Sequence, residues 1–145
     1  MSMPKSNMKI NRKGVRYISN IDRASYTIKE LSRAALRDVA RLIKYNIRQE
    51  FNKLPGMRKQ TSRFKGAYQH WLRKKEGDLQ IGIKHNTWYG VNQELGSKNQ
   101  PKRDFIRNAV YKNIDEIRKI EGQYLSAIED ENNALRLINE EEEIE

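Results

Sequence analysis

Two histidines, His70 and His85, are the side chains best suited to acid–base catalysis near neutral pH. Neither stands near a pair of acids at metal-ligand spacing, and the chain has no cysteine to act as a nucleophile or to bind zinc. Gly90 and Gly96 lack the Gly-Lys-Ser/Thr that would follow in a phosphate-binding loop. We therefore expect a protein that is not an enzyme and that holds no metal or cofactor. The alternative in this class is an RNase-type toxin that uses His70 or His85 with nearby basic groups.

Charge is distributed unevenly along the chain. The 145 residues include 29 lysines and arginines against 19 aspartates and glutamates, for a net charge of +10. Residues 129–145 contain eight acids and a single base, so residues 1–128 carry a net charge of +17. A body this basic attracts polyanions, nucleic acid first among them, and it attracts acidic protein surfaces by the same physics. A basic nucleic-acid-binding module or regulator is therefore a second functional alternative.

The N-terminal segment is basic and contains few large apolar groups. We expect residues 1–24 to form a flexible basic arm with one short strand at Val15–Ile18. The segment lacks the apolar stretch of a secretory signal, and no apolar run in the chain approaches the roughly 20 residues that span a bilayer. Together with the lack of cysteine, these features predict a protein that is made in a reducing cytoplasm and does not contact a membrane.

A long amphipathic helix is expected to follow this arm. Thr27 and Glu30 have the spacing of a capping box and predict the start of the helix, and Pro55-Gly56 ends the helical region. Basic residues occupy much of its remaining surface, as a solvated face or as a contact for DNA phosphates. The apolar residues recur at steps of three and four and are Leu31, Ala35, Val39, Leu42, Ile43, Ile47 and Phe51. The basic residues are Arg33, Arg37, Arg41, Lys44 and Arg48.

Two short alternating segments predict a β-hairpin. Apolar and polar residues alternate over 67–73 and 79–84, on either side of a Lys75-Glu76-Gly77-Asp78 turn. Residues 85–103 are rich in Asn, Gly, Gln and Lys and predict a loop. A second long helix is expected over 104–130, with Ile106, Val110, Ile114, Ile117, Tyr124 and Ile128 on its buried side.

These elements predict an α+β fold, in which a small antiparallel β-sheet (the hairpin plus an extra strand) packs against two long α-helices. We expect a single domain over residues 25–130. Residues 131–145 are expected to form an acidic C-terminal tail, because like charges in the run Glu140–Glu143 repel one another. Such a tail either frays or serves as an interaction segment.

The segment Trp88–Phe105 reads WYGVNQELGSKNQPKRDF and has the residue types of a tight corner that leads into a helix. Gly96 allows a positive φ, and Ser97 can hydrogen-bond back to close the turn. Pro101 stiffens the loop before the helix, and Phe105 is expected to anchor the helix entry. Beside them, Arg103 and Arg107 could meet carboxylates or phosphate.

This segment resembles the hallmark of the phage neck or tail-completion (head–tail joining) proteins named after gene product ten of phage HK ninety-seven. The resemblance rests on an aromatic and small-residue start at 88–90, an acid-x-Gly-Ser turn at 94–97 and a Pro-x-Arg-x-Phe stretch at 101–109. It extends over residues 28–128. Leu95 replaces the usual aromatic residue, and Asn108 stands where the family often has proline.

The resemblance implies a structural virion protein at the head–tail junction, assembled in the bacterial cytoplasm. Such a protein forms a ring, commonly a hexamer, by protein–protein contacts. Its partners are connector or stopper proteins and the tail tube or tail terminator protein, and genomic DNA passes through its lumen. The candidate interface residues are Trp88, Tyr89, Glu94, Gly96, Ser97, Pro101, Arg103, Phe105 and Arg107, and the candidates that face the lumen and its DNA are Arg58, Lys59, Arg63 and Lys65.

Overall fold

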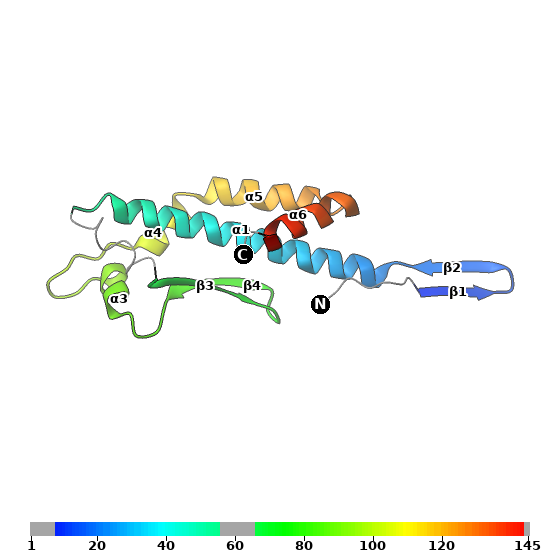
Figure 1. Cartoon of the computed structure of the whole chain (residues 1–145), viewed down its shortest axis with the longest axis horizontal. Coiled ribbons are helices and arrows are strands. Elements are labelled where there is room, and N and C mark those ends of the chain that lie inside the picture. Colours follow the sequence, from blue (N-terminus) through cyan, green and yellow to red (C-terminus); the bar gives the residue numbers. More distant parts are fainter. Residues whose placement is uncertain (1–7, 56–65, 144–145) are drawn as a thin grey trace.

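The computed structural model describes residues 8–55 and 66–143, with side chains described up to residue 140. Within these residues the chain is α+β, as the sequence predicted, with two strands at the start of the order, helices at its end and two separate antiparallel sheets of two strands each. Figure 1 shows an elongated molecule with one long helix through its middle. The elements are β1 (Met8–Arg12), β2 (Val15–Ser19), α1 (Ile21–Asn52), β3 (Tyr68–Arg73), β4 (Asp78–Ile83), α3 (Trp88–Leu95), α4 (Phe105–Tyr111), α5 (Ile114–Ser126) and α6 (Glu131–Glu143).

The first helix is longer than predicted and does not begin with a capping box. α1 starts at Ile21, and Thr27 lies buried inside it with a hydroxyl that has no hydrogen-bond partner. Glu30 pairs with Arg33 instead of reaching back to Thr27. The extension is held by a contact that local spacing cannot reveal: Arg23 of α1 forms a 2.7 Å ion pair with Glu131 at the start of α6.

The apolar stripe of α1 was predicted correctly at its main positions. Val39, Ile43, Ile47 and Phe51 are buried in a core shared with the β3–β4 hairpin, and Leu31 is buried in a second core shared with α5 and α6. Figure 1 shows why one helix serves both cores: the hairpin runs along one side of α1, and α5 and α6 run along the other.

The β3–β4 hairpin forms where the alternating segments predicted it. Its register pairs Tyr68 with Ile83, and Arg73 with Asp78 beside the turn. The expected extra strand does not join this sheet. Instead β2 pairs with β1 in a hairpin of its own, closed by Lys13 and Gly14, which both have positive φ. A two-residue turn of this kind matches the twist of the flanking strands.

The second long helix is interrupted at Lys112-Asn113, and the prediction of one continuous helix over 104–130 is wrong. The Asn113 side chain donates a 2.8 Å hydrogen bond to the carbonyl of Ala109, and this hydrogen bond stands at the end of α4. Asn113 then precedes the first turn of α5, where the negative charges of Asp115 and Glu116 interact favourably with the positive end of the helix dipole. An asparagine that bonds to nearby backbone competes with helix continuation, which explains the break.

The C-terminal acidic segment is folded over most of its length. α6 begins after Asp130, whose Oδ1 accepts hydrogen bonds from the backbone N–H groups of Asn132 and Asn133. Its apolar side packs against α1 in the second core and supplies Ala134, Leu137 and Ile138. The segment therefore differs from the frayed tail that its charge suggested, because apolar residues at steps of three and four outweigh the repulsion.

Candidate functional site

The predicted loop that follows the β3–β4 hairpin contains a helix, α3. Gly90 is buried against the end of the hairpin: a Cβ built there would lie 3.0 Å from Ile83 Cγ2 and 3.1 Å from the Ala67 Cβ. A Cβ at this position would be tighter than ordinary contacts, so Ile83 and Ala67 would have to shift to admit any residue larger than glycine. Trp88, Tyr89 and Glu94 thus stand on a helix, and the prediction of an irregular loop over 85–103 is wrong for these residues.

α3 holds the entry of α4 through Glu94. Both carboxylate oxygens of Glu94 accept from the backbone N–H of Ile106, at 3.1 and 3.2 Å. Asp104, the residue before α4, has a left-handed φ of 50° and no capping hydrogen bond from its own side chain. The negative charge that usually comes from a cap residue is therefore supplied by a neighbouring helix.

Gly96 has the positive φ that the sequence predicted, whereas the predicted hydrogen bond from the Ser97 side chain does not close the turn. Gly96 has φ 80° and ψ 167°, and a Cβ there would lie 2.9 Å from the backbone nitrogen of Lys102. Ser97 closes the turn through its backbone, which exchanges hydrogen bonds of 2.9 and 3.2 Å with Gln100. The segment Trp88–Arg107, named here the helix-entry corner, is therefore fixed by backbone contacts as much as by side chains.

Two of the candidate interface residues are engaged inside this corner. The guanidinium of Arg103 donates a 3.0 Å hydrogen bond to the buried amide of Gln93, and the Arg103 carbonyl accepts one of 3.1 Å from Asn108. Phe105 is 5% exposed and lies 4.2 Å, between ring centroids, from Phe51. The prediction that Phe105 anchors the helix entry is confirmed. As a candidate interface residue, Phe105 offers a partner very little surface, because its side chain is buried against Phe51.

Tyr68 completes the aromatic cluster beneath the corner. Its ring meets Phe51 edge-on at 5.5 Å, and its buried hydroxyl lies close to the Glu94 carboxylate. Burial raises the pKa of the Tyr68 phenol well above its usual value, and the negative charge of Glu94 raises the same pKa further. The neutral phenol is therefore strongly favoured in the folded chain.

The remaining candidates present their side chains to solvent. Trp88, Val91 and Leu95 are exposed at steps of three and four and share one side of α3. The exposed Arg107 guanidinium lies 5.7 Å from the ring centroid of Tyr111, a cation–π distance. Ser97 and Pro101 are also exposed, whereas Tyr89 is half-buried and packs against the first core. The lumen candidates Arg58, Lys59, Arg63 and Lys65 lie outside the described residues.

The two histidines lie in different parts of the described structure. His70 is half-buried in β3 opposite Ile81, and His85 is exposed after β4. Among residues 8–55 and 66–143, no three potential ligand side chains gather as they would around a metal ion. A search of the same residues finds no helix with the length and apolar character needed to cross a bilayer.

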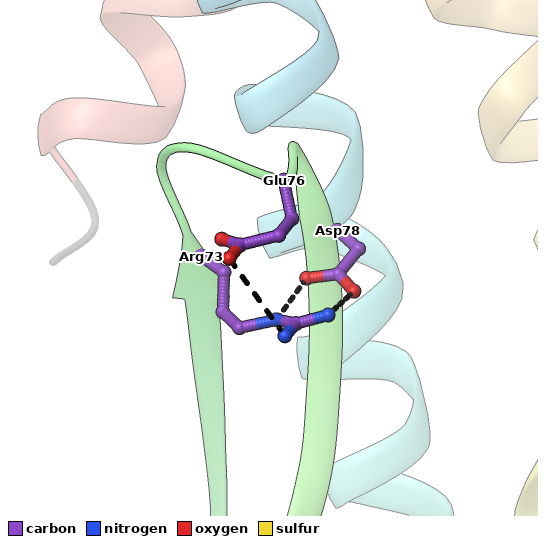
Figure 2. A network of polar contacts seen from close by, with 3 residues as sticks. All are labelled: Arg73, Glu76 and Asp78. Carbon is purple, nitrogen blue, oxygen red and sulfur yellow. Dashed lines mark hydrogen bonds and ion pairs between the residues drawn. The ribbon is translucent and has the colours of Figure 1, made fainter.

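The turn of the β3–β4 hairpin carries a polar network (Figure 2). Arg73 Nε donates a 2.7 Å hydrogen bond to Asp78 Oδ1, and a second guanidinium nitrogen pairs with Asp78 Oδ2. Glu76 lies 4.0 Å from the same guanidinium. The bond from Arg73 lowers the pKa of Asp78. All three side chains are largely exposed, so the network closes the turn and leaves no group poised for chemistry.

The basic side of α1 is less open than the sequence suggested. The five bases that could have met DNA phosphates are each half-buried, because elements pack along both sides of α1. These residues are Arg33, Arg37, Arg41, Lys44 and Arg48.

Comparison with known proteins adds no relative. No family model matches the chain, and neither the curated proteins nor the solved structures include one that matches it significantly.

Proposed function

We propose that this protein is a structural component of the head–tail junction of a tailed bacteriophage or prophage, and that it assembles as a ring by protein–protein contacts between connector and tail. The observation that carries the proposal is the helix-entry corner. Its residues resemble the motif of head–tail joining proteins, and the same residues support one another in space through Gly90, Glu94 and Gly96.

The surfaces of the chain support an assembly role. The exposed side of α3 offers Trp88, Val91 and Leu95 next to a rigid corner, and aromatic groups on rigid elements are frequent anchors of interfaces. By contrast, the half-buried bases of α1 disfavour a nucleic-acid-binding module that reads DNA with this helix. Positive charge elsewhere on the body suits a ring whose lumen DNA passes through.

Deletion of the gene from its genome of origin tests the proposal. We expect DNA-filled heads and separate tails in electron micrographs, and joined particles again when the gene is supplied on a plasmid. A His70→Ala/His85→Ala chain should complement as well as the wild type, because neither histidine serves the assembly role. Joined infectious particles at an unchanged yield after deletion would contradict the proposal, as would loss of complementation by a folded double-histidine variant that has also lost RNA cleavage.

A further inference from the structure

The N-terminal hairpin, Met8–Ser19, has one apolar face and one basic face. Cross-strand partners share a face of a sheet, so Ile10 lies with Tyr17 and Arg12 with Val15, and Met8 joins them opposite Ser19. Lys9, Asn11, Arg16 and Ile18 form the other face. The hairpin is thus amphipathic in the same way as a strand pair that packs on a core.

The apolar face of this hairpin is uncovered in the single chain. Met8 is 60% exposed and Val15 is 70% exposed, and Ile10 and Tyr17 are also exposed. Figure 1 shows that β1 and β2 extend beyond the N-terminal end of α1, away from the two cores. An isolated two-stranded hairpin is marginally stable in water at best. A cover from outside the chain would supply the burial that its own body does not.

The chain carries a surface of matching chemistry at the junction of α5 and α6. Leu125 is 65% exposed and Ile128 is 39% exposed, and both line an open apolar groove against Leu31 and Leu36 of α1. Ile128 also lines a neighbouring hollow, together with Glu129. Large apolar side chains therefore stand beside carboxylates, which is the complement of a hairpin with apolar and basic groups.

The charges of the two surfaces are opposite, and one of the junction's carboxylates, Glu131, is already paired with Arg23 of the same chain. Residues 8–19 contain four bases and no acid, whereas residues 121–131 contain four acids and no base. The bases are exposed on the hairpin, and Glu121 and Glu129 are exposed at the junction. Charge complementarity of this kind steers association and sets its register.

We propose that the N-terminal hairpin is an assembly arm that docks on the α5–α6 junction (Glu121–Glu131) of a second copy of this chain. Within one chain the hairpin starts near that junction and extends away from it (Figure 1), whereas a neighbouring copy can bring its own junction to the strands of the hairpin. An interface between two different surfaces of identical chains generates a ring when the rotation closes. The inference rests on the proposed function in this respect alone: it names the contact by which the ring is held.

Because the chain has no cysteine, cross-linking can test this contact cleanly. Tyr17→Cys in one chain and Leu125→Cys in a second chain of different mass are mixed and treated with a short thiol cross-linker. We expect a mixed dimer at several-fold higher yield than from Tyr17→Cys with Tyr45→Cys. Tyr45 is the matched control, because it is 57% exposed and lies in the C-terminal half of α1, outside both proposed contact surfaces.

Equal yields from the two mixtures would overturn the proposal. So would a Tyr17→Cys/Leu125→Cys chain that cross-links only within itself, since the hairpin would then fold back on its own body. Sedimentation that shows monomers of the wild-type chain at every protein concentration would also overturn it.

Charge reversal provides an independent test of the same contact. Arg12→Glu, on the same face as Tyr17, should weaken self-association several-fold in sedimentation, and Glu121→Arg/Glu129→Arg in the partner chain should restore most of the loss. If the reversed arm lowers salt-dependent binding to duplex DNA but leaves self-association unchanged, the arm contacts DNA and the proposal is wrong.

Failure of this inference and failure of the proposed function can be told apart. If a chain that lacks residues 8–19 still joins heads to tails in the complementation assay, the arm is dispensable and the proposed function stands. If the full chain neither enters particles nor restores joining, the proposed function itself fails.

Discussion

The helix-entry corner and the N-terminal hairpin are both short segments, but they differ in whether their side chains find contacts within the chain. In the corner, Glu94 meets Ile106, Arg103 meets Gln93 and Phe105 meets Phe51, all within one chain. In the hairpin, every strand residue is exposed except the half-buried Ser19. The difference separates a segment that builds the body from one whose side chains the body leaves exposed.

Truncating the buried side chain that anchors the corner is expected to have the largest effect on stability. Phe105→Ala should lower the free energy of unfolding by about 3–5 kcal/mol, because it leaves a cavity against Phe51 in the first core. Tyr17→Ala in the hairpin should change it by less than about 0.5 kcal/mol, since the side chain has little to lose in the single chain. Urea unfolding of dilute protein measures both. Similar losses from the two variants would remove the distinction.

A glycine pair tests whether the corner is held by its backbone. Gly96→Ala should cost about 1–3 kcal/mol, because its φ and ψ lie in a region that is nearly restricted to glycine and its Cβ would press on Lys102. Gly122→Ala is the control: it lies inside α5 with open space around it, and it should add about 1 kcal/mol of stability. Thermal unfolding should therefore move in opposite directions, and a tolerated Gly96→Ala would count against the corner as described.

The cap that Glu94 of α3 provides for α4 is expected to contribute less to the free energy of unfolding than Phe105 or Gly96 does. Glu94→Ala should lower the free energy of unfolding by about 1 kcal/mol, through loss of an acceptor for the Ile106 N–H. Glu94→Gln should recover part of this loss, because an amide oxygen still accepts. Glu76→Ala, in the exposed turn of Figure 2, serves as the control and should have almost no effect. An equal effect of the two alanine variants would contradict the cap.

The smallest expected effect concerns the pH dependence of stability. Because burial and then Glu94 raise the pKa of Tyr68, the folded chain keeps this proton at a pH where the unfolded chain loses it, above about 10. The stabilisation is complete below that pH and is lost as pH rises. Tyr68→Phe should leave stability at pH 7 unchanged or slightly higher and should flatten the alkaline decline. An alkaline decline as steep as that of the wild type would show that Tyr68 does not cause it.

Local patterns predicted those elements whose causes are local. The apolar stripe of α1 and the β3–β4 turn were predicted from spacing alone, and Gly96 was recognised as a residue that permits a positive φ. The start of α1 was not, and there Arg23 pairs with a residue 108 positions away, a contact that local spacing cannot reveal. The sequence also holds signals for two features that were not predicted. Asn113 before two acids marks the break after α4, but the apolar periodicity favoured one continuous helix. Ala134, Leu137 and Ile138 mark the buried side of α6, but the run of acids favoured a tail.

The site was predicted in its residue types and not in its geometry. Phe105 and Gly96 could be assigned from chemistry, since a large apolar group and a glycine each have few roles at a helix entry. The role of Glu94 could not, because it depends on α3 forming first. That helix in turn depends on the close approach of Gly90 to Ile83 and Ala67, which only the folded hairpin supplies.

The most direct test of the central claim is the location of this protein in assembled particles. A C-terminally tagged chain is expressed during particle production, and the purified particles are labelled with gold against the tag and viewed by electron microscopy. We predict gold at the junction between head and tail in joined particles. Gold distributed over heads or tails without preference, or tagged protein that stays out of the particles while joining proceeds, would contradict a role in head–tail joining.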